Sequence, residues 1–337
     1  MSVVIVADWD ADGVVSAAEL LYAQEKLGVF PVRGKVHVDL VPSGPRGFKD
    51  KVSGKCWEYV IVIDIPFTDD VDSGLKSMVD SGCKFKLYYF DHHKSTSENI
   101  EHIERTYGGI VVSGSTSTSL IIKNFLEKLG IKITPRLKLF IEAVTAIEGG
   151  KRTSASEGVV KLVIAISKHL NRTKSPDIWC KYVRWLADPI PFDEIELLLG
   201  KETPGLVDES LRVSKEADEE LRDIAMSFAM SARKIGYLRF IDARGKWSGR
   251  GASALASAVH KIVGEPVVLL TDRSDGITLV IIRSSRGEAG RLIDMLYALG
   301  LVEDRGGHSN IAVGKLSKNV SLKDLELNLL RLSLYMR

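Results

Sequence analysis

Three short apolar runs near the start of the chain each end in acidic residues. The runs are Val3–Val6, Tyr59–Ile63 and Leu87–Phe90, and their β-branched and aromatic residues are typical of buried parallel strands. The residues that follow them are Asp8-Trp9-Asp10-Ala11-Asp12-Gly13, then Asp64, then Asp91-His92-His93. Because the carboxyl ends of parallel strands meet at one edge of a sheet, the sequence predicts that these side chains converge on a single site.

Such a concentration of carboxylates favours a metal site. Neighbouring carboxylates repel one another, and divalent cations bound by Asp oxygens and His nitrogen remove that repulsion. Any one of these Asp residues could instead cap a helix or form a turn after a strand. Capping needs neither a second acid nor an imidazole, so the three clusters together point to metal binding.

The length and order of the predicted elements indicate two domains. The chain has 337 residues, more than one core usually organises. Strands and helices alternate from residue 1 to about 150, which predicts an α/β fold with a doubly wound, mostly parallel sheet of five strands. We expect a catalytic domain over residues 1–200, a connection over 201–235 with a long helix from Val207 to Ile235, and a smaller α/β domain over 236–337.

Composition excludes some classes of protein. Hydrophobic residues make up 45% and charged residues 27%, and no apolar stretch has the length of a membrane span. The net charge of +2 is too small to indicate nucleic-acid binding by itself. The chain enters its first strand without a basic or cleavable leader, so we expect a cytoplasmic protein.

The cysteines do not suggest a disulfide framework. Cys56, Cys83 and Cys180 lie far apart in the sequence and form no CxxC pair. This spacing argues against a disulfide framework and against a thiolate zinc site, and we expect three buried residues that pack as small hydrophobic side chains.

These motifs, in this order, resemble the DHH phosphoesterase superfamily in its archaeal RecJ-like nuclease branch. The resemblance rests on DxDADG, the lone Asp64 and Asp-His-His in the first half of the chain. In the second half it rests on Ile282-Arg283-Ser284-Ser285 and on Gly306-Gly307-His308-Ser309-Asn310-Ile311-Ala312-Val313-Gly314, which are similar to motifs of the DHHA1 substrate domain.

The resemblance implies two metal ions, Mn²⁺ in preference to Mg²⁺, that activate water for attack on a phosphodiester. Asp10 and Asp12 would each hold one ion, Asp64 would bridge them, and His92 would be a further ligand. Asp8 would be a ligand or a nearby acid. Asp91 and His93 would orient the ligands or contact the phosphate.

One motif of the superfamily is incomplete. Its fourth motif usually supplies another Asp, whereas this sequence reads Val144-Thr145-Ala146-Ile147-Glu148-Gly149-Gly150. Glu148 could replace that ligand, and Glu142 is a weaker substitute. Alternatively, Glu148 is only solvated, or the site binds its second metal weakly and depends on a higher Mn²⁺ concentration.

The resemblance also implies substrate-binding residues. Arg283, Ser284 and His308 would hold phosphate, with Gly306 and Gly307 allowing close backbone approach; an edge-strand Arg and a Gly-Gly turn are the structural alternatives. Further candidates precede two predicted helices: Arg244, Lys246, Trp247 and Arg250, and the hydroxyl run at Ser115 and Thr116. Trp247 could stack on a base or simply pack, and the hydroxyls could bind an anion or simply cap the helix.

Three functions follow from the resemblance. The first is a metal-dependent exonuclease on single-stranded DNA or RNA, which could associate with a replicative or repair helicase complex. The second is a phosphodiesterase of small nucleotides, namely short oligonucleotides, 3'-phosphoadenosine phosphate or cyclic dinucleotides. The third is a non-catalytic subunit of a replication or repair complex, against which the retained acids argue.

Overall fold

The computed structural model of the chain describes residues 1–149, 154–189, 205–247, 251–273 and 275–335, without the side chain of His308. The described residues form two compact units, Met1–Lys215 and Glu216–Arg337. The division falls within helix α11 (Leu206–Ser231), in the segment where a connection was expected. Among the described residues, none of the helices combines the length and the apolar character needed to cross a lipid bilayer.

The first unit contains the expected five-stranded parallel sheet. Its strands are β1 (Val3–Ala7), β2 (Val38–Pro42), β3 (Tyr59–Ile63), β4 (Lys86–Asp91) and β5 (Ile110–Ser113). They are arranged in the order β2-β1-β3-β4-β5, and every neighbouring pair is parallel. The chain therefore changes direction across the sheet between β1 and β3, which is where open α/β sheets bind ligands.

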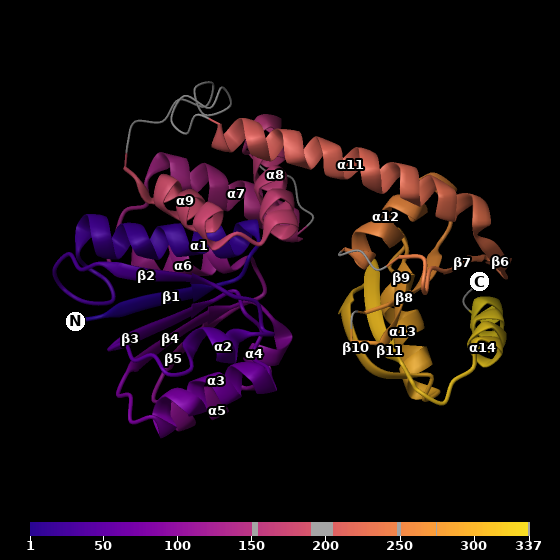
Figure 1. Cartoon of the computed structure of the whole chain (residues 1–337), viewed down its shortest axis with the longest axis horizontal. Helices are drawn as coiled ribbons and strands as arrows, with labels where there is room; N and C mark the ends of the chain where they lie inside the picture. Colours follow the sequence, from indigo (N-terminus) through magenta and orange to yellow (C-terminus); the bar gives the residue numbers. More distant parts are fainter. Residues whose placement is uncertain (150–153, 190–204, 248–250, 274, 336–337) are drawn as a thin grey trace. The chain divides into compact units, whose positions relative to one another are not determined.

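Helices cover both faces of this sheet (Figure 1). One group is α1 (Ala11–Leu21), which continues as the π-helical segment η1 (Tyr22–Leu27), with α6 (Thr118–Lys128), α7 (Pro135–Gly149), α8 (Glu157–Thr173) and α9 (Pro176–Ala187). The other group is α2 (Phe48–Val52), α3 (Asp69–Asp80), α4 (Lys94–Glu98) and α5 (Ile100–Tyr107). The doubly wound arrangement predicted from the sequence is confirmed.

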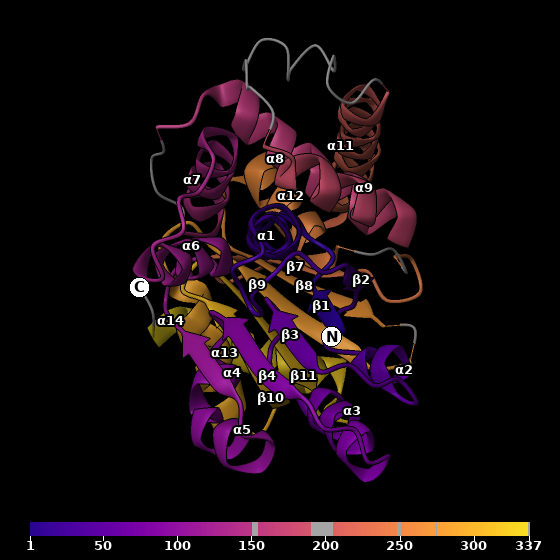
Figure 2. The same ribbon diagram turned by 90° about the vertical axis from the view of Figure 1, so that its left-hand side faces the viewer.

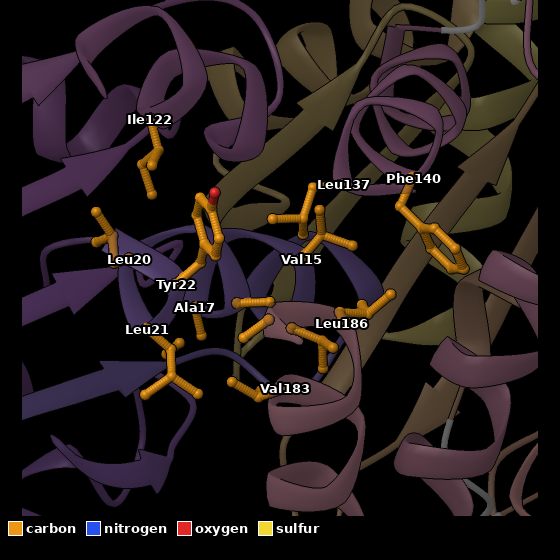
Figure 3. Close-up of a cluster of buried hydrophobic side chains, with 14 of the residues drawn as sticks. Val15, Ala17, Leu20, Leu21, Tyr22, Ile122, Leu137, Phe140, Val183 and Leu186 are labelled. Carbon is orange, nitrogen blue, oxygen red and sulfur yellow. The ribbon is translucent and has the colours of Figure 1, made fainter. Parts of the chain in front are cut away.

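Alternate residues of each strand face two different cores. In β1, Val3 and Ile5 belong to one hydrophobic cluster, whereas Val4 and Val6 belong to the other. This two-residue period follows from the pleat of the strand. Helix α1 is buried along its whole length, and Figure 3 shows its residues Val15 and Leu20 among side chains from α6, α7 and α9.

The second unit has a mixed six-stranded sheet of order β10-β11-β9-β8-β7-β6. Its elements are β6 (Arg233–Ile235), β7 (Leu238–Asp242), α12 (Ala252–Val263), β8 (Val267–Asp272), β9 (Thr278–Arg283), α13 (Glu288–Ala298), β10 (Val302–His308), β11 (Ile311–Leu316) and α14 (Leu322–Tyr335). Helices α13 and α14 pack on one face of this sheet, and α11 and α12 pack on the other. The turned view in Figure 2 shows the first sheet, with α1 and α6 on one side and α3 and α5 on the other. Only β7 and β8 pair in parallel among its described strands.

Three expectations about these elements were wrong. The helix expected to reach Ile235 ends at Ser231, and Arg233–Ile235 forms a strand that pairs with β7. Cys56 and Cys83 form a disulfide with a Cα–Cα distance of 5.4 Å, although their spacing argued against one. Cys56 is exposed and Cys180 is half-buried, so neither is the buried residue that was expected.

Candidate metal centre

The acids that follow β1, β3 and β4 lie side by side. Ala7 is paired with Ile63, and Ile63 is paired with Phe90. Asp8, Asp64 and Asp91 are the next residues of these three neighbouring strands, so they stand in one row at the carboxyl edge of the sheet. The structure thus brings together the three clusters that the sequence analysis singled out.

The turn into α1 adds two further carboxylates to this row. Asp10 caps the helix by accepting a hydrogen bond from the backbone N–H of Gly13, at 3.0 Å. Asp12 lies in the first helical turn and is buried. Gly13 packs directly on the backbone of Asp8, where a Cβ atom would collide with the carbonyl oxygen. The glycine of DxDADG is therefore required by this close approach.

Asp12 is bound by the first residues of helix α6. Its two carboxylate oxygens accept hydrogen bonds from the backbone N–H groups of Thr118, at 2.7 Å, and Ser119, at 2.9 Å. These donors have no partner inside a helix, and the positive end of the helix dipole favours a nearby carboxylate. The start of α6 therefore holds a carboxylate that belongs to α1.

The imidazole of His92 faces the same carboxylates. Its Nδ1 atom lies 3.6 Å from Asp12 Oδ2 and 3.7 Å from Asp64 Oδ1. The hydroxyl group of Thr118 donates a hydrogen bond to Asp64 Oδ1 at 2.8 Å and lies 3.4 Å from His92 Nδ1. Thr118 therefore contacts three of the expected metal ligands.

Thr118 was not among the predicted site residues. The prediction placed the helix start and the functional hydroxyls at Ser115 and Thr116, but α6 begins at Thr118 with Ser117 as its cap. Ser115 and Thr116 are exposed, whereas Thr118 is fully buried. The signal was present in the sequence as a run of hydroxyl residues, yet the run does not indicate which hydroxyl points to the site.

Asp91 and His93 form a separate hydrogen-bonded pair behind the site. His93 Nδ1 lies 2.7 Å from Asp91 Oδ1, and the other oxygen of Asp91 accepts a hydrogen bond from the hydroxyl of Thr96. Asp91 is fully buried. One possible ligand atom each of Asp64, His92 and His93 lies within 4.8 Å of the others. His93 thus reaches the ligand cluster, while the contacts of Asp91 are those of a residue that orients another.

The backbone of Asp64 adopts a left-handed conformation, with φ at 56°. Its N–H group donates to the carbonyl oxygen of Phe90 at 2.9 Å, which fixes the turn after β3. For a residue with a side chain this conformation costs on the order of 1 kcal/mol, and such strain is concentrated at functional sites. The turn directs the Asp64 carboxylate toward Thr118 and His92.

The electrostatics of the site favour bound cations. Burial and the carboxylate of Asp10 raise the pKa of Asp8 to about 7. Burial and the carboxylate of Asp12 raise the pKa values of Asp10 and Asp64 as well. Burial alone would lower the pKa of His92, but its interactions with Asp12 and Asp91 outweigh burial and raise it. The metal-free site therefore retains protons that divalent ions would displace.

Glu148 lies near this cluster, in the last turn of α7. Burial and the carboxylates of Asp10 and Asp12 raise the pKa of Glu148, while His92 and His93 oppose the increase. Glu142 instead accepts a hydrogen bond from the hydroxyl of Ser154. Of these two residues, Glu148 is the one in electrostatic contact with the site. Glu148 is desolvated where it faces the cluster but still exposes much of its surface to solvent, so its assignment as a ligand stays a prediction.

The donor set fits the expected ions. Carboxylate oxygens suit Mg²⁺ and Mn²⁺, and a preference for Mn²⁺ stays a prediction. The site holds acids from three strand ends, one helix start and one helix end.

In the second unit, Arg283 and Ser284 lie at the end of β9, against the β10–β11 turn. Arg283 Nη1 donates to the carbonyl oxygen of Asn310 at 2.9 Å. The hydroxyl of Ser284 donates to Glu288 at 2.6 Å and accepts from the N–H of Arg286 at 3.1 Å. Ser284 is fully buried and both donates and accepts a hydrogen bond, which favours a structural role, and its role as a phosphate ligand stays a prediction.

Gly306, Gly307 and His308 end strand β10. Gly307 has a φ of 116°, and a Cβ atom there would lie 2.8 Å from Cα of Ala312 on the paired strand. A Cβ on Gly306 would meet no atom within 4 Å. Gly307 is therefore required by the hairpin itself, whereas no neighbouring atom requires a glycine at position 306, and the expected close approach of a ligand there stays a prediction.

The remaining predicted substrate residues lie after β7. Arg244 is paired with Asp242, which was not anticipated. Lys246 is exposed, and Trp247 is half-buried against the core between α11 and α12, as its packing alternative predicted. Arg250 lies outside the described residues.

No family model matches this sequence, and no curated protein matches it. Comparison with solved structures shows that the chain has the two-unit α/β fold of RecJ and related phosphodiesterases. It matches RecJ from Thermus thermophilus in complex with Mn²⁺ with a TM-score of 0.62 and 15% identity, over 99% of this chain and 52% of that one. The chain thus spans about half the length of the Thermus protein.

Two further structures match the whole chain. Exonuclease RecJ bound to manganese gives a TM-score of 0.53 and 16% identity, over 99% of this chain and 90% of that one. A pGpG-specific phosphodiesterase from Vibrio cholerae gives a TM-score of 0.51 and 13% identity, over 99% of both chains. At these identities the likeness shows a common fold.

Proposed function

We propose that this protein is a metal-dependent phosphodiesterase of the DHH superfamily. The observation that carries the proposal is the row of Asp8, Asp64 and Asp91, joined by Asp12 and His92 within hydrogen-bonding reach of one threonine. The row lies at the direction change of a RecJ-like sheet, and two of the matching structures contain manganese.

The residues present would hold two ions in the way that the resemblance implied. Asp10 and Asp12 would each hold one, Asp64 would bridge them, and His92 would complete the ligand set with Asp8 and Glu148 beside it. Bound ions would polarise the phosphoryl group and lower the pKa of a water molecule. Asp91 fixes the His93 ring through Nδ1, which leaves the other ring nitrogen for a ligand or for the substrate phosphate.

Our first choice of substrate is single-stranded DNA or RNA, degraded from one end. The support is the fold and the presence of a second unit in which Arg283 and the open Gly306 lie near one hairpin. Association with a helicase complex belongs to the same proposal and has no support beyond the resemblance.

A specific observation favours small nucleotides as the second candidate. The Vibrio cholerae pGpG-specific phosphodiesterase and this chain match over 99% of each other. The exposed cations expected along a strand are also fewer, because Arg244 is paired.

Digestion assays decide between the candidates. End-labelled DNA and RNA strands of about 2 to 30 nucleotides and the dinucleotide pGpG would be incubated with Mn²⁺ or Mg²⁺. Preference for long strands supports the exonuclease, and preference for dinucleotides supports the alternative. No hydrolysis of any substrate would leave a non-catalytic subunit as the remaining candidate. Asp64→Asn is the control for contaminating nucleases.

A further inference from the structure

Thr118 is the one described residue whose contacts join ligand candidates from three separate strand ends. Its backbone N–H donates to Asp12, which follows β1, and its hydroxyl donates to Asp64, which follows β3. The same hydroxyl oxygen lies 3.4 Å from Nδ1 of His92, which follows β4. We propose that Thr118 is a positioning residue that sets the geometry of the metal ligands and the ring tautomer of His92. This inference rests on the proposed metal site.

The hydroxyl group has only one proton, and this fixes the direction of its hydrogen bonds. A carboxylate that binds metal is ionised and can only accept, so the proton of Thr118 is committed to Asp64. The hydroxyl oxygen can then only accept from His92, which requires the hydrogen of the neutral ring to be on Nδ1. The lone pair of a neutral His92 is consequently on Nε2, as is usual when the other ring nitrogen of a metal-binding His donates to the protein.

The position of Thr118 makes this arrangement rigid. The residue is fully buried in the first turn of α6, and the preceding Ser117 is held by Leu120 N and by the hydroxyl of Thr145 at 2.6 Å. The hydroxyl of a threonine in a packed helix has few alternative positions. Thr118 also holds one oxygen of Asp64, which leaves the second oxygen of that strained residue to face a ligand.

The test uses an isosteric substitution. Thr118→Val keeps the shape of the side chain and the backbone N–H bond to Asp12 but removes the hydroxyl. We expect the Kd for Mn²⁺, measured by calorimetry on the full chain, to rise about 10- to 100-fold, which is the usual effect of losing a group that orients a metal ligand. Thr118→Ser retains the hydroxyl and should stay within about 3-fold of wild type. Thr106→Val, on exposed helix α5, is the matched control.

A second measurement needs no variant. Nitrogen-15 NMR of wild-type protein loaded with Mg²⁺, which is diamagnetic, should show His92 with its hydrogen on Nδ1. An Nε2–H tautomer, or an unchanged Mn²⁺ affinity in Thr118→Val, would overturn the proposal. If wild type binds Mn²⁺ but hydrolyses no phosphodiester, the proposed function fails while the role of Thr118 in metal binding is still decided by these two readouts.

Discussion

The guanidinium group of Arg244 donates to both carboxylate oxygens of Asp242, at 2.8 and 2.7 Å. The hydrogen bonds from Arg244 lower the pKa of Asp242, so the pair stays ionised at neutral pH. The positive charge of Arg244 is therefore offset by an acid two residues away. A nucleic acid strand that passed this loop would therefore be attracted more strongly by Lys246 than by Arg244.

Releasing Arg244 from this pair should strengthen strand binding. We expect Asp242→Asn to tighten the binding of a 20-nucleotide strand severalfold at low salt and to steepen the salt dependence by about one charge, because one more phosphate is neutralised. Lys246→Ala should have the opposite effect, and dinucleotide affinity should not change in either variant. Fluorescence anisotropy at several salt concentrations would measure this. Asp275→Asn, which frees Arg273 from a comparable pair, is the control. Equal strand affinities in wild type, Asp242→Asn and Lys246→Ala would favour the small-nucleotide alternative.

Removing a central carboxylate should abolish turnover without unfolding the protein. We expect Asp10→Ala and Asp64→Ala to lower kcat at least about 1000-fold, because a lost metal ligand removes several kcal/mol of transition-state stabilisation. In EDTA both variants should remain folded, because the relief of repulsion between the carboxylates offsets the lost cap bond of Asp10 to Gly13 and the lost bond of Asp64 to Thr118. Activity within tenfold of wild type in either variant would reject the assigned site.

Glu148 and Glu142 are the two candidates for the ligand that the fourth motif lacks, and both lie on helix α7. Glu148→Gln should raise the Mn²⁺ concentration for half-maximal activity about tenfold, because a charged ligand near Asp10 and Asp12 is neutralised. Glu142→Gln, on the same helix, should leave the metal titration unchanged. A shift in the second variant but not in the first would reverse the assignment.

The metal-free protein should lose stability as the pH rises. The pKa of Asp8 is raised from 3.8 to about 7 in the folded chain, so the folded state binds the proton more tightly than the unfolded state. The resulting stability is fully present below about pH 4 and is lost as the pH rises toward 7, with a magnitude on the order of 4 kcal/mol. Urea unfolding in EDTA at several pH values measures it. Asp8→Asn should flatten the profile, and a wild-type profile that rises over this range would contradict the prediction.

Burial of Glu19 should also make the metal-free protein less stable as the pH rises. This residue of α1 is fully buried, and neither carboxylate oxygen has a hydrogen-bond partner among the described residues. Burial raises the pKa of Glu19 well above its usual range. Because a buried polar group without a partner is destabilising, Glu19→Met should stabilise the metal-free protein at pH 8 by about 1 to 3 kcal/mol in urea unfolding. Glu101→Met, at an exposed position, should change little; a destabilised Glu19→Met would indicate a hidden partner.

The sequence predicted the parallel sheet well because its strands are apolar runs bounded by acids and glycines. It did not predict strands β10 and β11, because Glu303, Asp304 and Arg305 are exposed on an edge strand and have no apolar pattern. The helix predicted from the sequence ran through β6 because no Gly or Pro interrupts that stretch. The disulfide was missed because the amino ends of β3 and β4, which bring Cys56 and Cys83 together, are neighbours only in the folded sheet.

The same distinction applies to the site. Residues that follow strands, such as Asp64 and His92, were predicted because strand ends converge. Thr118 and Asn310 were not, since each acts through contacts with segments distant in sequence. Conversely, Ser284 and Arg244 match motifs or charge patterns, but their neighbours Glu288 and Asp242 engage them internally.

The bond between Asp12 and the start of α6 has a consequence for how the protein folds. The two partners are 106 residues apart, and all five strands of the first sheet precede Thr118 in the chain. Contacts of such long separation form late, after the entropy of loop closure has been overcome. During synthesis, the acids of β1, β3 and β4 would therefore emerge before the helix that organises them. A nascent chain released before α6 should bind Mn²⁺ poorly even where its strands have formed, so metal affinity reports completion of the first unit.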